Sequence, residues 1–262
     1  MKNKTILTVV ITVLALLVAG SGGFILFQNI NSRQSKEKYD ALASTAASFS
    51  DGTGEGTGAV TESSLPLNPI AFSTLQAQNP EIYAWITVPN TNVNYPVLRS
   101  ETNDNFYIDH GVDKGYSFAG AIYSQFCNKK DFSDRVTVLY GHNMADNSMF
   151  ATLHYFEDAD FFANNKSMRI YLPGKELEYE IVAAYVYDDS HIMNSFDFSK
   201  DEVYSDFLNT VLHPHSLESN VREGAALDVN DKIVILSTCL NYGEGRYLVV
   251  GKLTGETEMQ KH

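Results

Sequence analysis

Two strand-like runs in the chain bring together residues that can take part in acyl transfer. Residues 233–239 are β-branched and apolar and end in Cys239, and a turn-like connector with two glycines leads to a second such run that begins at Arg246. This pattern is typical of a hairpin, so Cys239 and Arg246 are expected to be neighbours. A thiolate can attack a carbonyl carbon, and a guanidinium can stabilise the oxyanion that develops. A buried core cysteine and a surface arginine are the alternative interpretation.

A third reactive residue ends another strand-like run upstream. Residues 136–140 are again β-branched, and Gly141 and His142 follow them directly. A cysteine and a sequence-distant histidine that the fold brings together are typical of a thiol nucleophile with its proton-transfer partner.

These motifs resemble those of a known family. Leu139-Tyr140-Gly141-His142 combined with Leu236-Ser237-Thr238-Cys239 and the following Arg246 is similar to the sortases, the cell-wall transpeptidases of Gram-positive bacteria. Further segments are similar to class B sortases in particular: residues 85–91, 95–97, 105–108, 120–123, 131–134 and 143–153. The resemblance extends over residues 70–254. One difference is the connector between Cys239 and Arg246, which is shorter than in many class B members and makes the peptide preference hard to transfer.

The resemblance implies a fold and a set of site residues. The fold would be mostly β, a closed eight-stranded barrel with an N-terminal helix and an extra helix before the last strand pair. Cys239 would be the nucleophile, His142 the acid/base, and Arg246 the group that holds the substrate carbonyl or oxyanion. The implied substrate-binding residues are Ser237, Thr238, Ile108, Ser190 and Ile192.

The implied reaction is cleavage of a C-terminal sorting signal after Thr, followed by transfer of the thioacyl group to an amine. The partners would be surface proteins that carry the signal, and the amine would come from a cell-wall precursor or, in a pilus-building enzyme, from a pilin lysine. Two alternatives stay open: a cysteine peptidase with water as acceptor, and an adhesion module in which Cys127 and Cys239 form a disulfide. No cofactor or metal is expected, because the two histidines around Pro214 lack further metal ligands nearby.

The amino-terminal sequence predicts a membrane location. An apolar segment from Ile6 to Phe27 follows Lys2 and Lys4, and about 20 such residues can span a bilayer. Residues 1–27 are therefore expected to form an anchor with a cytoplasmic amino terminus and an extracellular catalytic domain at the cell membrane. A cleaved signal peptide with a processing site near residues 19–21 is the alternative.

The remaining sequence predicts a linker and one domain. Residues 28–64 are polar and then rich in Gly, Ser, Thr and Ala, which predicts a flexible extracellular linker. The catalytic domain is expected over residues 65–262. Residues 41–262 hold 14 basic and 30 acidic side chains, a net charge of −16. This balance excludes a nucleic-acid partner, because phosphate contacts require Lys and Arg.

Periodicity predicts a β-rich domain with few helices. The expected strands are residues 84–88, 95–98, 120–123, 136–140, 168–171, 178–186, 232–238 and 246–252. Helices are expected near 71–78, 148–155 and 200–212, the last with Val203, Phe207, Leu208 and Val211 on one face.

Overall fold

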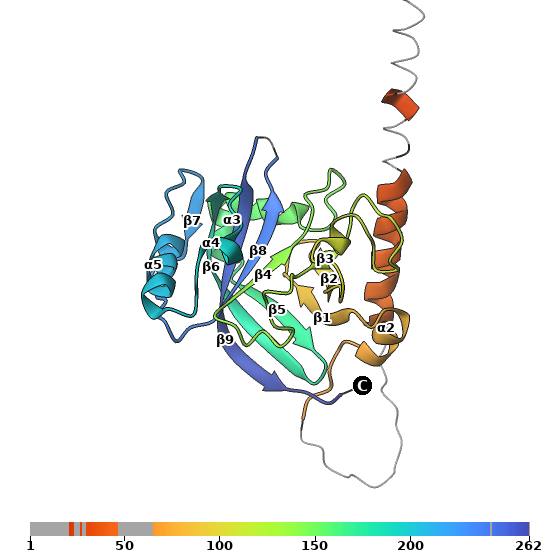
Figure 1. Ribbon diagram of the computed structural model, residues 1–262, viewed down its shortest axis with the longest axis horizontal. Helices are drawn as coiled ribbons and strands as arrows, with labels where there is room; N and C mark the ends of the chain where they lie inside the picture. The colour runs from red at the N-terminus through yellow and green to blue at the C-terminus, as the bar shows by residue number, and fades with distance from the viewer. Residues whose placement is uncertain (1–20, 24–26, 28–29, 47–64, 242, 262) are drawn as a thin grey trace, which may run out of the picture.

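A closed β-barrel forms the centre of the protein (Figure 1). The computed structural model describes residues 21–23, 27, 30–46, 65–241 and 243–261. Its strands are β1 (Ile82–Thr87), β2 (Asn94–Leu98), β3 (Ile122–Tyr123), β4 (Val136–Tyr140), β5 (Ser167–Leu172), β6 (Lys175–Tyr187), β7 (Ser219–Val221), β8 (Ile233–Cys239) and β9 (Arg246–Glu258). They run in the order β5-β1-β2-β3-β4-β8-β9-β6-β7, and β5 also pairs with β6. Eight strands thus close the barrel, and β7 extends it at β6, which confirms the expected fold.

The barrel register brings the reactive strand ends together. Parallel pairing of β4 with β8 aligns Tyr140 with Ser237. Antiparallel pairing of β8 with β9 aligns Cys239 with Arg246, so the predicted hairpin is confirmed. His142 follows the end of β4, and its backbone therefore leaves the sheet beside the end of β8.

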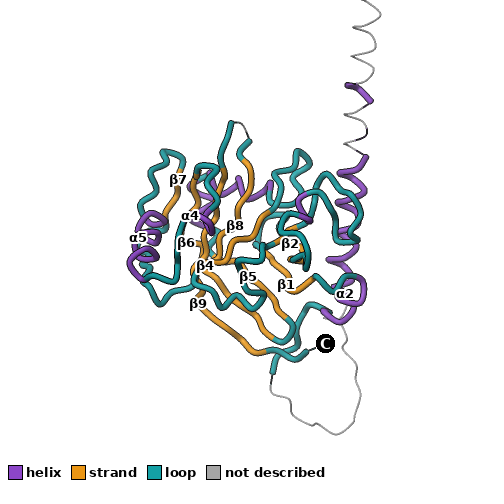
Figure 2. The backbone as a smooth tube through the Cα atoms, viewed as in Figure 1, coloured by secondary structure: helices purple, strands orange, loops and turns teal. Residues whose placement is uncertain are grey.

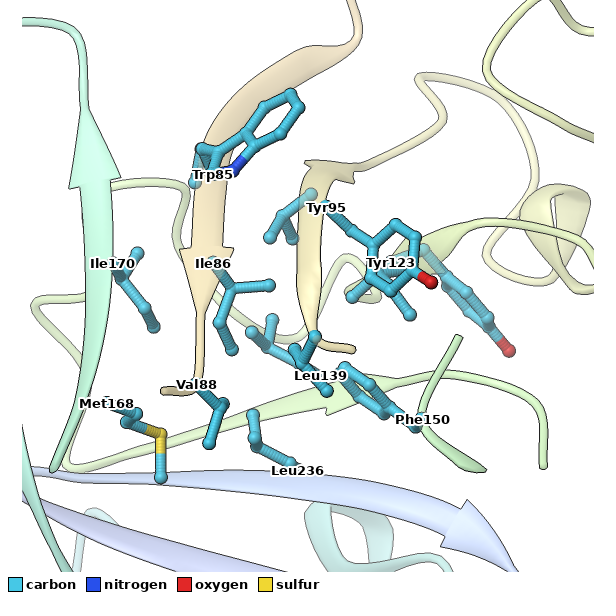
Figure 3. Close-up of a cluster of buried hydrophobic side chains, with 14 of the residues drawn as sticks. Trp85, Ile86, Val88, Tyr95, Tyr123, Leu139, Phe150, Met168, Ile170 and Leu236 are labelled. Carbon is cyan, nitrogen blue, oxygen red and sulfur yellow. The ribbon is translucent and has the colours of Figure 1, made fainter. Parts of the chain in front are cut away.

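Alternation along β8 assigns its side chains to two cores. Val234 and Leu236 belong to the cluster inside the barrel, which Figure 3 shows around Leu139 and Leu236. Ile233 and Ile235 belong to a second cluster on the outer face. Because successive side chains of a strand point to opposite faces, Ser237 and Cys239 share the face of Ile235, and Thr238 shares the face of Leu236.

Short helices connect and cover the strands (Figure 2). They are α2 (Phe72–Gln78), the 3-10 helices η1 (Phe106–Ile108) and η2 (Ala151–Glu157), α3 (Ala159–Asn164), α4 (Ile192–Ser195) and α5 (Asp201–Leu212). Helix α5 is the extra helix expected before the last strand pair. Its buried face differs at one position from the expected one: Tyr204 is fully buried, and Val203 is only half-buried. The Tyr204 hydroxyl is hydrogen-bonded to the carbonyl oxygens of Arg135 and Asp231, at 3.1 and 2.7 Å.

The structure differs from the predicted flexible linker over part of its length. Residues 30–46 are helical and lie beside α2 at one edge of the barrel (Figure 1). Tyr39, Leu42 and Ala46 are buried there, and the Tyr39 hydroxyl donates to the carbonyl of Gly120 at 2.9 Å. Their spacing of three and four residues is that of a helical apolar stripe, which the polar composition of the segment obscured. Residues 28–29 and 47–64 of the predicted linker lie outside the described residues.

The predicted location as a single-pass membrane protein is corrected. In the described part of the chain, no helix is both long enough and apolar enough to cross a membrane. Residues 1–20 and 24–26 of the predicted anchor lie outside the described residues.

Candidate active site

The Cys239 thiol and the Arg246 guanidinium are in direct contact. Nη1 of Arg246 lies 2.9 Å from Sγ of Cys239, and both side chains are half-buried. They line a cavity of about 150 Å³ at the ends of β4, β8 and β9. The complete lining consists of Ile108, Tyr123, Tyr140, Gly141, His142, Ser237, Cys239 and Arg246. The three residues expected to be catalytic therefore share one cavity.

His142 is held by the segment that contains η1. Its Nε2 lies 2.6 Å from the carbonyl oxygen of Ile108, and its ring stacks with that of Phe118 at a centroid distance of 6.3 Å. A carbonyl oxygen can only accept, so Nε2 carries the hydrogen in this contact. The imidazole is thus oriented by a backbone group rather than by a carboxylate.

Gly141 lets the backbone just before His142 pass close to the barrel core. A Cβ at this position would lie 2.5 Å from Cδ1 of Ile122 and 2.7 Å from the ring of Phe150. No side chain fits there without displacing the neighbouring core. The glycine therefore lets the chain turn out of β4 against a packed surface.

Two tyrosines of the cavity were not anticipated from the sequence. The rings of Tyr123 and Tyr140 lie 5.5 Å apart at the ends of β3 and β4. Burial raises the pKa of Tyr123 to about 12, although the nearby Arg246 opposes this shift. Its phenol is therefore a neutral hydrogen-bond donor at physiological pH. The sequence signal that could have indicated these two tyrosines is an aromatic residue at the end of a strand next to a reactive residue.

A second cavity continues the first one. It has a volume of about 60 Å³, and Ser190, Ile192, Tyr187 and Leu248 contribute to its lining. Tyr140, Ser237 and Arg246 line both cavities. Four of the five expected substrate-binding residues, Ile108, Ser190, Ile192 and Ser237, thus lie along one continuous surface, in which Ile108 is exposed and Ile192 is buried.

Thr238 is not part of this surface. Its side chain is completely buried, and its Oγ1 has no hydrogen-bond partner. The expected role of Thr238 in lining the substrate groove is corrected, because alternation along β8 turns this side chain to the barrel interior.

Both cysteines are free thiols. Cys127 is exposed and Cys239 is half-buried, so the disulfide of the adhesion-module alternative is not formed. Burial and the nearby Asp104 raise the pKa of Cys127, which keeps this thiol in its protonated form. Within the described residues, no group of three or more His, Cys, Asp or Glu side chains is arranged to hold a metal ion.

Comparison with known proteins shows the family of the chain. The family model described as Sortase domain matches residues 86–254, a range that includes Cys239, His142 and Arg246. The chain belongs to the sortase family. Sortase B of Listeria monocytogenes is 32% identical over 182 residues, which cover 68% of this chain and 72% of the relative. Sortase B of Staphylococcus aureus is 27% identical over 258 residues, which cover 97% and 98% of the two chains.

Solved structures agree at the level of the fold. The crystal structure of Clostridium perfringens sortase B is 33% identical and superimposes with a TM-score of 0.63, covering 70% of this chain and 100% of the other. The protein is thus a class B sortase, a cysteine transpeptidase that acts on sorting signals.

Proposed function

We propose that Cys239, His142 and Arg246 are the catalytic residues of this sortase. The main support for this proposal is the 2.9 Å contact between Arg246 Nη1 and Cys239 Sγ, in a cavity that His142 also lines. A guanidinium at this distance stabilises a thiolate and is placed to donate to an oxyanion that forms next to it. We assign the catalytic domain to residues 65–262.

The first half-reaction forms a thioester. The Cys239 thiolate attacks the carbonyl carbon of the Thr in the sorting signal, and the oxyanion of the tetrahedral intermediate accepts hydrogen bonds from Arg246. His142 gives a proton to the amide nitrogen as the bond after Thr breaks, and the carboxyl-terminal fragment leaves as an amine. The remainder of the surface protein stays on Sγ as a thioacyl group.

The second half-reaction transfers this group to an amine of a cell-wall precursor. His142 accepts a proton from the amine as its nitrogen attacks the thioester carbonyl, and Cys239 leaves as thiolate. An amide bond replaces the thioester, and the enzyme returns to its starting state. The net charge of −16 over residues 41–262 favours the approach of a cationic acceptor.

The sorting signal is proposed to bind along the two connected cavities. Ile108 and Ser237 would contact the residues next to the scissile bond, and Ser190 and Ile192 would contact the residues that precede them. Support comes from the lining of the cavities, because Ser237 and Arg246 belong to both. Concave, mostly apolar surfaces with a few polar groups are typical of peptide and small-ligand sites.

The test uses peptides of the NPxTx and LPxTG types with the purified enzyme and an amine acceptor. Mass spectrometry is expected to show cleavage after Thr and an adduct of the amine. Cys239→Ala is expected to abolish both products, whereas the matched variant Cys127→Ala keeps them. Full transpeptidation by Cys239→Ala would refute the assignment. A product that contains only the free acid, with every acceptor tried, would identify water as the acceptor and the protein as a peptidase.

A further inference from the structure

The backbone carbonyl of Cys239 accepts hydrogen bonds from two side chains outside the cavity. Nε2 of His154 lies 3.0 Å from this oxygen, and Nδ2 of Asn143 lies 3.2 Å from it. A carbonyl oxygen has two lone pairs, so two donors satisfy it completely. The last residue of β8 is thus fixed by contacts beyond the ladder of the sheet.

His154 is held on one ring face and at both nitrogens. Its Nδ1 lies 2.5 Å from Oε1 of Glu157, three residues later in the chain, and its ring stacks on Tyr247 at a centroid distance of 4.9 Å. Only 8% of its side chain is exposed. Nδ1 faces a carboxylate oxygen of Glu157, and Nε2 faces the carbonyl oxygen of Cys239. Buried polar contacts of this kind hold a group in one orientation.

Asn143 connects the same carbonyl to the proposed acid/base. It follows His142 directly, and its Nδ2 also donates to Oδ1 of Asn241, at 2.9 Å. The same Nδ2 also lies 3.2 Å from Nε2 of His154, so the amide contacts the Asn241 oxygen, the Cys239 oxygen and the imidazole. Asn143 thus links the backbone that follows His142 to the backbone of Cys239. The buried His154 contacts the same carbonyl oxygen.

We propose that His154, braced by Glu157, is a positioning residue that aligns the Cys239 thiol with Arg246 and His142. The inference rests on the proposed role of Cys239. His154 does not line the reactive cavity, so it acts through the backbone of Cys239 and not on the peptide. Small displacements of a nucleophile reduce the rate strongly. The proposed peptide contacts at Ile108, Ser190 and Ile192 lie on other segments and are not made through the Cys239 carbonyl. Loss of His154 therefore lowers kcat and leaves KM for the peptide unchanged.

The test compares two substitutions of the same residue. His154→Leu removes both polar contacts at similar volume, and His154→Gln can place its amide nitrogen where Nε2 lies. We expect His154→Leu to lower kcat for the sorting peptide about tenfold, with KM changed less than about twofold, and His154→Gln to recover most of the loss. Glu157→Gln is expected to lie between the two, because it keeps an acceptor for Nδ1 and removes the charge. His215→Leu, at an exposed histidine, is the matched control and is expected to behave like the parent enzyme.

A second readout does not depend on the sorting peptide. In a Cys127→Ala background, the rate of alkylation of Cys239 by iodoacetamide reports how well the thiolate is held beside Arg246. We expect a several-fold slower rate in His154→Leu and a recovered rate in His154→Gln, even if no peptide of the panel is cleaved. Should His154→Leu fail to fold, as judged by circular dichroism, the comparison of His154→Gln with Glu157→Gln gives the answer.

Three results would overturn the proposal. Unchanged kcat and alkylation in a folded His154→Leu would show that the carbonyl needs no side-chain donor. An increase in KM as large as the decrease in kcat would indicate a general disturbance of the groove. A loss that His154→Gln does not recover at all would indicate that packing against Tyr247, and not the hydrogen bond, is what matters.

Discussion

The carbonyl oxygen of Ile108 lies 2.6 Å from Nε2 of His142 and so ties the proposed acid/base to the segment between η1 and β3. The helix over residues 30–46 contacts the same segment: Lys38 forms an ion pair with Asp113, and the Tyr39 hydroxyl donates to the carbonyl of Gly120. Gly120 has a φ of +58°, and a Cβ there would lie 2.5 Å from the carbonyl oxygen of Tyr107. The amino-terminal helix therefore supports a tightly packed segment that orients His142.

Tyr39→Phe is expected to loosen this support. The substitution leaves the buried Gly120 carbonyl without its donor, which costs about 1–3 kcal/mol of unfolding free energy. Urea unfolding would measure this loss, and kcat is expected to fall with it because His142 is held less firmly. Tyr116→Phe, at a tyrosine that is 63% exposed, is the control and should change neither quantity. A Tyr39→Phe protein with parental stability would show that the helix does not brace the segment.

Glu81 makes the stability of the same region depend on pH. Burial raises the pKa of Glu81, but hydrogen bonds from Tyr107, Lys114 and the backbone amide of Glu101 outweigh it and lower the pKa below its usual 4.5. A carboxyl group with a depressed folded-state pKa contributes stability that is complete above its unfolded pKa and is lost as pH falls through the folded value. We therefore expect this contribution to disappear progressively below about pH 4.5.

The variant Glu81→Gln tests this linkage. At neutral pH it should unfold at a lower urea concentration than the parent protein, and the difference should shrink as pH falls from 5 to 3. Glu223→Gln, at an exposed glutamate, is the matched control. A difference between Glu81→Gln and the parent that is the same at pH 7 and pH 3 would contradict the assignment.

Periodicity and turn chemistry were sufficient to predict the barrel strands and the meeting of Cys239 with Arg246. Residues 233–239 and 246–252 are long β-branched runs joined by a glycine-containing connector, and such local signals determine a hairpin. The alternation of side chains along β8 also predicts that Thr238 points away from the face that Ser237 and Cys239 share. Its expected place in the groove came from the family resemblance, whereas its side chain is completely buried in the barrel.

Long-range contacts could not be predicted from the sequence. Nothing local indicates that His154, in a short 3-10 helix, reaches the Cys239 carbonyl 85 residues away. The contact of the Ile108 carbonyl with His142 is a similar case, because any residue type supplies a backbone acceptor. The burial of Tyr39 and Leu42 is another, because these residues lie in a mostly polar part of the sequence. These contacts depend on how the barrel closes, which only the three-dimensional structure shows.

Gly141→Ala is expected to damage the site through packing. The added Cβ would overlap Ile122 and Phe150, and overpacking of this kind typically costs about 1–3 kcal/mol of unfolding free energy. It also shifts His142, so kcat should fall more than stability alone explains. Gly255→Ala is a matched control, because its nearest contact would be an ordinary 3.8 Å to Glu178. Thermal unfolding and peptide cleavage measure the two effects, and a Gly141→Ala enzyme with parental values of both would show that the chain there has room to adjust.

Arg246→Lys separates the positive charge from the geometry of the guanidinium. An ammonium keeps the charge but cannot donate through a planar fork, so it cannot both contact Sγ of Cys239 and reach an oxyanion beside it. Removal of one oxyanion donor typically costs about a hundred- to a thousandfold in kcat, and we expect Arg246→Lys to fall in this range with little change in KM. Arg169→Lys, at a half-exposed arginine of β5 that forms an ion pair with Glu176, is the control and should keep the parental kcat. Single-turnover cleavage of the sorting peptide measures the acylation step directly. A lysine variant that acylates at the parental rate would show that charge alone is sufficient, and the guanidinium would then act on the thiolate and not on the oxyanion.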